Sequence, residues 1–471
     1  MSALQSRLDL YKKRPGLDQK STASAAPGLD TEGPLTGPPA MQIAAADYES
    51  TAALAKESPA IVSADPGTAA SLVSFGAYGF EILAPGFLIA RLRRPLAGIQ
   101  MGRSRLGDYA PFSVSSILEL SSIHHPEAVH PRDILFLDTE TTGLSRGVAT
   151  IPFLIGLAWL DGDALVTELL FIQEPGGEAA CLDYLSALWQ RFSYMVSYNG
   201  KSFDIPLIRN RMILHRRRGL SIGLHFDMLH IMRRLFVRGS VAGYKQGDLE
   251  RELLGHERTA DLPGERIPQI YFDYVKYGRD AGLKSVFQHN DWDLQGLVLL
   301  FLEAVRLYNQ RDEAELQLRS GLARILMRNQ DDEGALALLL KSEQEAEVSD
   351  SLPLDIRYRD RLLLARIHRR RGSWALAADV FAGLVADYNC PWSRMYLARL
   401  QEHRLGEPGL ALENILFLEK QLYQTDLDQL TGAERSDMAY VMGSIPIQNR
   451  AFSRSALQHR IARLERKMNQ A

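Results

Sequence analysis

Short apolar runs between residues 131 and 200 alternate with polar and glycine-containing segments. Four of them have the length of buried strands: "DILFLDTE", "TIPFLIGLAWL", "ALVTELLFIQ" and "YMVSYNG". Amphipathic patterns of helical period follow, at "DIPLIRNRMILHRRRG" and "DMLHIMRRLFVRG". Strands first and helices later are typical of a mixed sheet covered by helices. We therefore expect one α/β domain at residues 131–308.

The segment before this domain has a different composition. Residues 69–130 contain short apolar runs such as "FEILAPGFLIARLRRPL", separated by Gly and Pro, which predicts a small β-rich lead-in. Residues 1–68 are rich in Pro, Ala, Gly, Ser and Thr. Such a segment buries too little apolar surface to offset its ordering entropy, so we predict a mostly disordered N-terminal segment.

The β pattern ends after residue 308. "LAR" recurs at 322, 364 and 397, and each copy is followed by a small pair, Ala335-Leu336, Ala377-Ala378 and Ala411-Leu412. The copies are 42 and 33 residues apart. Paired helices that repeat at about the second of these spacings resemble tetratricopeptide repeats. We predict an all-α, tetratricopeptide-like region at residues 309–471, ending in the basic helix "SRSALQHRIARLERKM". A plain helical bundle is the alternative.

Length and composition limit the class of protein. With 471 residues, 46% of them hydrophobic, the chain fits a soluble protein of two or three domains. A net charge of -3 does not indicate a general polyanion binder, so nucleic-acid contacts require a local basic patch. Cys181 and Cys390 are too isolated for a disulfide framework. Since there is no signal-peptide core and no apolar run of membrane-spanning length, we expect a cytoplasmic protein.

Two carboxylates stand at the end of the first buried strand. Residues i and i+2 of a strand share a face, so Asp138 and Glu140 are expected to point the same way. Paired carboxylates repel one another there, and a divalent cation such as Mg²⁺ or Mn²⁺ is the usual compensation. Asp-x-Glu occurs five times, but only this copy follows an apolar strand and precedes "TTGL". A solvated or capping acid is the alternative for any single copy.

Other acids make the metal interpretation stronger. Asp204 follows the strand "YMVSYNG" and begins a helix. On a later helix, His289 and Asp293 are four residues apart and share one face, whereas Asp291 lies on another. Four carboxylates and a histidine could hold two cations in the arrangement used for in-line phosphoryl displacement. The imidazole of His289 could accept the proton of an attacking water.

Several stretches in order resemble a known family. They are "LDTETTGLS", "FLIGLAW", "SYNGKSFDIPLI", "FDMLH", "DLPGERIPQIYFDY" and "HNDWD", at about residues 131–305. They resemble the DEDD exonucleases of the ribonuclease H-like superfamily, and more closely the YprB-type ribonuclease H-like domain. The resemblance implies a ribonuclease H-like fold, 3′–5′ polarity and two divalent cations, Mg²⁺ or Mn²⁺. By position it makes His289 the general base and the metal ligands Asp138, Glu140, Asp204 and Asp293. The histidine precedes the last aspartate by four residues, whereas the commonest histidine branch uses five.

A basic cluster lies beside these acids. The helix that begins at Asp204, with its end, carries Arg209, Arg211, Arg216, Arg217 and Arg218. Such a cluster could hold phosphates, and Asn199 in the preceding turn could shape the floor of the cleft. A solvated helix face and a plain turn are the alternatives. Asp227 is either a fifth acid or, as we favour, a helix N-cap. "DLPGER" at 261 predicts a turn into an extended segment.

These features predict a metal-dependent 3′–5′ exonuclease acting on DNA or RNA, single-stranded or with a free 3′ end. The helical repeats would provide a surface for a protein partner or for nucleic acid. The alternative is an adaptor, in which the nuclease fold does not cut and the helical repeats carry the function. Metal-dependent release of mononucleotides would separate the two.

Overall fold

The computed structural model describes residues 72–110, 112–143, 150–220, 223–237, 240–258, 261–349, 354–423 and 450–470. The segment predicted to be disordered, residues 1–68, lies outside these ranges.

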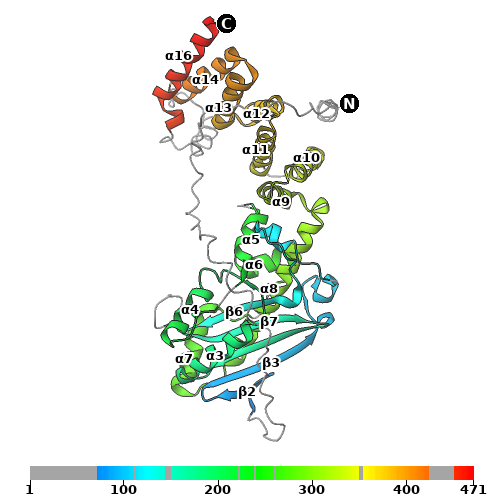
Figure 1. Ribbon diagram of the computed structural model, residues 1–471, viewed down its shortest axis with the longest axis vertical. Coiled ribbons are helices and arrows are strands. Elements are labelled where there is room, and N and C mark those ends of the chain that lie inside the picture. Colours follow the sequence, from blue (N-terminus) through cyan, green and yellow to red (C-terminus); the bar gives the residue numbers. More distant parts are fainter. Residues whose placement is uncertain are drawn as a thin grey trace. The chain divides into compact units, whose positions relative to one another are not determined.

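A mixed sheet forms the centre of the α/β region (Figure 1). Its eight strands are β1 (Leu72–Phe75), β2 (Tyr78–Ala84), β3 (Phe87–Pro95), β6 (Ile134–Thr141), β7 (Pro152–Asp161), β8 (Ala164–Ile172), β9 (Tyr194–Ser197) and β10 (Leu224–Asp227). They are ordered β1-β2-β3-β8-β7-β6-β9-β10. The pairs β6–β9 and β9–β10 are parallel, and the others are antiparallel. The predicted α/β fold with a mixed sheet is confirmed.

The β-rich lead-in belongs to this same sheet. Strand β3 pairs with β8 along its whole length, from Phe87 opposite Ile172 to Pro95 opposite Ala164. The boundary that the sequence placed at residue 131 therefore runs through one sheet, because the hydrogen bonds of β3 join the lead-in to the later strands. A two-stranded sheet of β4 (Gln100–Met101) and β5 (Ser104–Arg105) follows in the chain.

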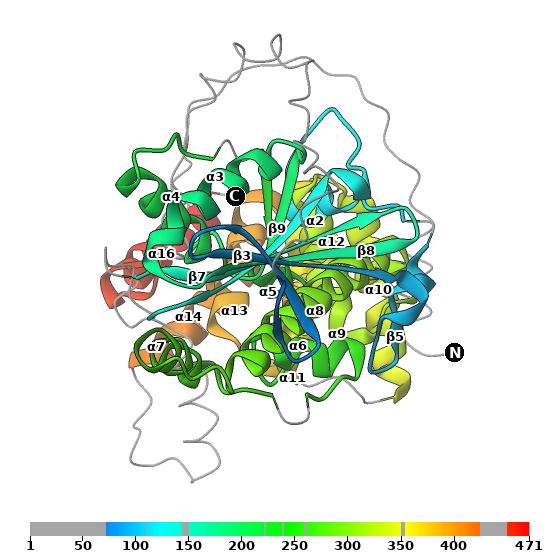
Figure 2. The same cartoon turned by 90° about the horizontal axis from the view of Figure 1, so that it is seen from below.

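Helices cover both faces of the sheet (Figure 2). On β6, Ile134 and Phe136 belong to the core under α8 (Leu283–Asn309). Leu135 and Leu137 belong to the core under α3 (Glu178–Trp189) and α4 (Asp204–Leu214). Burial on both faces explains why these strands appear as unbroken apolar runs. The end of β6 is therefore within reach of side chains from both helical layers.

The other helices of this region are α2 (Ile117–Ser121), α5 (Met228–Leu235), α6 (Gln246–Leu249), the π-helical turn Glu250–Leu254 and α7 (Ile267–Tyr277). The segment "DLPGER" leads through a 3₁₀ turn at Gly264–Arg266 directly into α7. The expectation of an extended segment there was wrong. Pro268 suits the first turn of a helix, where its missing N–H has no partner to lose.

The region after residue 310 is helical, as predicted. Its helices are α9 (Leu316–Arg328), α10 (Asp332–Ser349), α11 (Leu354–Arg370), α12 (Trp374–Tyr388), α13 (Pro391–Leu400) with the π-helical turn Gln401–Leu405, α14 (Pro408–Tyr423) and α16 (Arg454–Gln470). The alanines of the "LAR" copies and of the small pairs are all buried, at Ala323, Ala365, Ala398, Ala335, Ala377 and Ala411. Small residues there let neighbouring helices pack closely. The tetratricopeptide detail stays a prediction.

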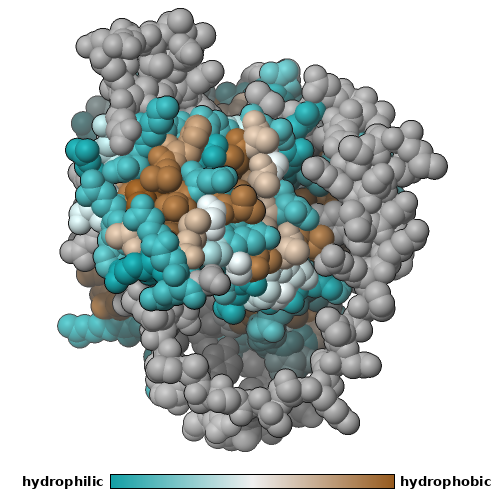
Figure 3. All heavy atoms as spheres, turned by 90° about the horizontal axis from the view of Figure 1, so that it is seen from above, coloured by the Kyte–Doolittle hydropathy of each residue, from teal (hydrophilic) through white to brown (hydrophobic). Residues whose placement is uncertain are grey.

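Apolar residues are exposed among hydrophilic ones (Figure 3), and large exposed examples on α14 include Leu410 and Phe417. Cys181 and Cys390 are both buried free thiols. Within the described residues, none of the helices has the length and apolarity that crossing a membrane requires.

Candidate active site

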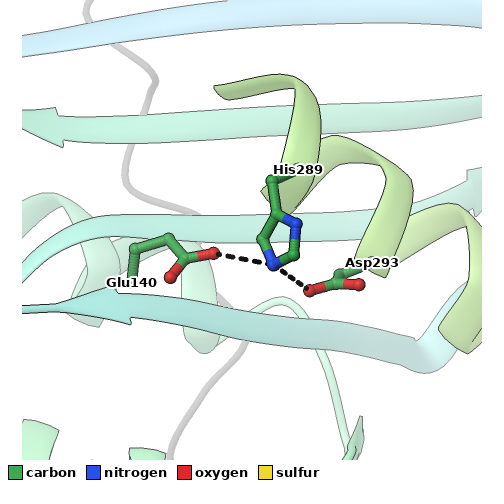
Figure 4. Close-up of side chains that lie close together, drawn as sticks. All are labelled: Glu140, His289 and Asp293. Carbon is green, nitrogen blue, oxygen red and sulfur yellow. Dashed lines mark ion pairs between the residues drawn. The ribbon is translucent and has the colours of Figure 1, made fainter. Parts of the chain in front are cut away.

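Helix α8 brings His289 and Asp293 to the end of β6, where Glu140 lies (Figure 4). His289 Nε2 is 3.8 Å from Glu140 Oε1 and 3.3 Å from Asp293 Oδ2. One donor atom of each residue lies within 4.8 Å of the others. The side chains are partly accessible, from 12% exposed at Glu140 to 18% at Asp293. These three residues form a group that could hold a metal ion.

Asp138 lies on the same strand, two residues before Glu140, and has its own partner. The side-chain amide of Asn290 donates to Asp138 Oδ2 at 2.7 Å, and Asn290 is fully buried. Asp138 pairs across the sheet with Gly156 of β7. A Cβ at position 156 would lie 2.0 Å from Asn290 Oδ1. The glycine of "FLIGLAW" thus makes room for the side chain that orients Asp138.

We expect Gly156→Ala to lower the free energy of unfolding by about 1–3 kcal/mol, because the new methyl group overpacks the site. It should also weaken Mn²⁺ binding, since Asn290 must move away from Asp138. Gly79→Ala is the matched control, because a Cβ at this strand position meets nothing within 4 Å. Chemical denaturation and calorimetric Mn²⁺ titration measure both effects. Equal behaviour of the two variants would contradict the close packing at position 156.

Asp204 reaches the end of β6 from the opposite helical layer. It is the first residue of α4, and the hydroxyl of Thr139 donates to its Oδ1. The turn before α4 is held by Asp227, whose carboxylate accepts from the backbone N–H groups of Asn199 at 2.8 Å and Lys201 at 3.1 Å. Asp227 also caps α5 through the N–H of Leu229, so the N-cap interpretation is confirmed. Asn199 has a left-handed backbone with φ 61° and serves the turn.

The four acids therefore converge on the end of one strand, but not as one compact group. Glu140 and Asp293 share a small volume with His289. Asp138 is turned toward Asn290, and Asp204 toward Thr139. The alternation of β6 explains the division, because Asp138 and Glu140 continue the α8 face whereas Thr139 continues the α4 face. The two-residue period of a strand predicts that Asp138 and Glu140 lie on one face. The position of Asp204 depends instead on the turn before α4.

Burial and mutual repulsion raise the pKa of these carboxyl groups. For Asp138 the largest cause is burial, followed by the charges of Asp293, Glu140 and Asp204. Burial also dominates for Glu140, with Asp293 next. Burial raises the pKa of Asp293 although Arg258 opposes it, and burial raises the pKa of Asp204 to about 6. The cluster is therefore poised to take up positive charge, either protons or a cation.

The shift at Asp204 predicts how stability changes with pH. Because its pKa in the folded protein, about 6, exceeds the ordinary value of 3.8, protons favour the folded state. This stabilising contribution is complete below the ordinary pKa and is lost as the pH rises through about 6. We expect Asp204→Asn, which cannot ionise, to gain stability over the wild type from pH 4 to 7 in EDTA. Urea unfolding at several pH values measures the gap, and a gap independent of pH would contradict the prediction.

A positive charge that the sequence analysis did not single out lies inside this acidic cluster. Arg258 makes two contacts with the fully buried Glu250, at 2.6 and 2.7 Å. Its Nη1 lies 2.5 Å from Asp293 Oδ1 and 3.2 Å from Asp261 Oδ2. The other oxygen of Asp261 lies 2.7 Å from His289 Nδ1. Arg258 and Asp261 stand on a connecting segment without hydrophobic periodicity. The sequence offered the stretch "DLPGER" as a signal for Asp261 but none for Arg258.

The predicted arginine cluster divides into two kinds of residue. Arg211 donates to Glu178 through two nitrogens and is 11% exposed, and Arg217 donates to both oxygens of Asp183. Their donors are used within the protein, and a contact of these two with nucleic acid stays a prediction. The remaining members are exposed and stay candidates: Arg209, Arg216 and Arg218.

Asp291 is not part of the site. Arg94 donates to both of its oxygens, at 2.8 and 2.6 Å, and the hydroxyl of Tyr78 lies 3.2 Å away. The sequence placed Asp291 on a different helical face from Asp293, and its buried ion pair confirms that expectation. It ties α8 to the strands of the lead-in.

Comparison with known proteins agrees with this geometry. Residues 135–305 match the RNase H superfamily. Over 303 residues the chain is 29% identical to the uncharacterized protein YprB of Bacillus subtilis (strain 168). The aligned stretch covers 62% of this chain and 71% of YprB. RNase H-like nucleases usually use divalent metals, and the acids and histidine described above are suitable ligands for such ions. The predicted ribonuclease H-like region and its likeness to YprB are confirmed.

Proposed function

We propose that this chain, which carries an RNase H superfamily domain at residues 135–305, is a metal-dependent 3′–5′ exonuclease. The observation that carries the proposal is the cluster of Glu140, His289 and Asp293 at the end of β6. Nuclease-type activity is what the superfamily suggests. The direction of digestion rests on the sequence resemblance to DEDD exonucleases.

The residues fit a pair of divalent cations, Mg²⁺ or Mn²⁺. Carboxylate oxygens are the ligands that these cations prefer. Burial raises the pKa of Asp138, Glu140 and Asp293, so a nearby positive charge would stabilise their charged forms. Together with Asp204, these carboxylates would hold the cations. When bound, such ions stabilise the attacking and leaving oxygens of a phosphodiester during in-line displacement.

The protein's own groups supply the proton transfer. His289 directs Nε2 toward Glu140 and Asp293, and from this position it takes the proton of the attacking water. Thr139 holds Asp204, and Asn290 holds Asp138, so both carboxylates are oriented before substrate arrives. Preorganisation of this kind lowers the reorganisation needed in the transition state.

The substrate in this proposal is DNA or RNA with a free 3′ end. Arg209 is exposed on α4, the helix that begins with Asp204. Arg216 and Arg218 are exposed just after this helix ends. Basic side chains at that place would attract the phosphate backbone without reading sequence. The helical region after residue 310 would then serve a partner or a longer substrate. We place this activity in the cytoplasm.

The test uses purified full-length chain with single strands of DNA or RNA labelled at the 5′ end. With Mn²⁺ we expect products that shorten from the 3′ end, and none in EDTA. A circular single strand is the control for internal cleavage. Binding without cleavage, in Mn²⁺ and in Mg²⁺, would contradict the proposal and favour the adaptor. Cleavage of the circle would point instead to an endonuclease.

A further inference from the structure

Two acids of the site each divide their oxygens between Arg258 and His289. Asp261 presents Oδ2 to Arg258 and Oδ1 to His289 Nδ1. Asp293 presents Oδ1 to Arg258 and Oδ2 toward His289 Nε2. The guanidinium is itself fixed by Glu250, which is fully buried. The buried Glu250 therefore fixes the orientation of Arg258. Arg258 in turn fixes the orientations of the Asp261 and Asp293 carboxylates.

We infer that Asp261 is a positioning residue that keeps the proton of neutral His289 on Nδ1 and leaves the Nε2 lone pair facing Glu140 and Asp293. This inference rests on the proposed function, in which that lone pair takes up a proton or a cation. It adds a residue from the connecting segment before α7 to a site built otherwise on β6, α4 and α8.

The distances support this tautomer. At 2.7 Å, His289 Nδ1 and Asp261 Oδ1 are close enough that one of them must carry a proton, and a carboxylate beside Arg258 is the acceptor. The imidazole therefore donates from Nδ1. Histidines that bind a metal through one ring nitrogen commonly donate the N–H of the other to a carboxylate.

Nε2 has the opposite surroundings. Its neighbours are oxygens of Asp293 at 3.3 Å and of Glu140 at 3.8 Å, and the second distance is too long for a hydrogen bond. A lone pair facing two carboxylates is repelled unless positive charge lies between them. The space in front of Nε2 is therefore suited to a divalent cation or to the proton that His289 removes.

Asp261→Asn provides a sharp test because Arg258 dictates how the amide must turn. Arg258 can donate only to the carbonyl oxygen, so the NH₂ group of the new side chain faces His289 Nδ1. That arrangement forces the proton of His289 onto Nε2, the tautomer that cannot use this atom as a base or ligand. Arg258→Gln is a poorer test, since it would leave the buried Glu250 without its charged partner.

The measurement is nitrogen NMR of the full-length, metal-free chain with ¹⁵N-labelled histidines at pH 8.5. His289 is assigned by its loss in His289→Gln. We expect a proton on Nδ1 in the wild type, on Nε2 in Asp261→Asn, and a mixture in Asp261→Ala. Asp280→Asn, the same substitution at an exposed position, should leave His289 unchanged. Mn²⁺ affinity should fall by about 10–100-fold in Asp261→Asn alone.

A His289 that keeps its proton on Nδ1 in Asp261→Asn would overturn the inference. So would an Mn²⁺ affinity within twofold of the wild type. Both readings are independent of nucleic-acid cleavage. If Asp261→Asn switches the tautomer while the wild type cleaves no strand, the positioning role stands and the exonuclease proposal fails.

Discussion

Asp138→Asn is expected to lower the rate of phosphodiester cleavage by about 10²–10⁴-fold while making the metal-free protein more stable. In the proposed mechanism the rate falls because losing a metal ligand removes several kcal/mol of transition-state stabilisation, and each 1.36 kcal/mol is about a factor of ten. Stability rises because the wild-type carboxylate is buried and repelled by Asp293, Glu140 and Asp204. Removing that charge keeps an oxygen for the amide of Asn290.

Melting curves with and without Mn²⁺ distinguish this outcome from simple damage. In EDTA we expect Asp138→Asn to melt higher by about 2–4 °C for each kcal/mol gained. Added Mn²⁺ should raise the melting temperature of the wild type, by linkage of binding to folding, and raise that of the variant much less. Glu265→Gln, an exposed acid before α7, is the control and should change neither rate nor stability. A variant that melts lower in EDTA and cleaves normally would contradict the assignment of Asp138.

The regular elements of this site could be predicted from the sequence because each follows from a short-range rule. Period two places Asp138 and Glu140 on one face of β6, and the spacing of four places His289 beside Asp293 on α8. Neither rule needs knowledge of distant residues. The same spacing rule correctly separated Asp291, which is paired with Arg94 instead.

The residues that orient these acids could not be predicted in this way. Arg258 and Asp261 lie between helices, and the α8 residues that they contact, Asp293 and His289, are 35 and 28 positions later in the chain. Nothing in "HNDWD" marks Asn290 as a site residue. Its role follows from the fold, in which Gly156 leaves room for its side-chain amide beside Asp138. Likewise, the lead-in strands gave no sign that β3 would find β8, since pairing across the sheet is a long-range contact.

The partners of the arginines could not be predicted for a related reason. A run of positive charge in a sequence predicts a phosphate-binding face, but it does not reveal which members have acidic partners elsewhere. Glu178 begins α3, a whole element before α4, and its carboxylate receives Arg211 and lies 2.8 Å from His215. Both helices had to be placed in the fold before this pair could be seen.

Arg211→Met should therefore destabilise the protein by about 3–5 kcal/mol, the usual cost of removing one partner of a buried ion pair. Glu178 is 2% exposed and would lose its arginine partner, keeping only the contact with His215. Urea unfolding gives the free energy, and the double variant Glu178→Gln/Arg211→Met should recover much of it, since neither charge then remains buried. Arg209→Met is the matched control on the same helix, and as an exposed residue it should change stability by no more than about 0.5 kcal/mol.

Binding measurements complete the distinction between the two arginines. Arg209→Met should weaken binding to a single strand and reduce the salt dependence of the affinity by about one phosphate contact. Folded Arg211→Met, assayed well below its unfolding midpoint, should bind with the wild-type salt dependence, because its guanidinium faces Glu178. The reverse pattern, with stability unchanged and binding lost in Arg211→Met, would mean that Arg211 leaves Glu178 to hold a phosphate. The buried carboxylate makes that exchange costly, since Glu178 would lose its charged partner in the core.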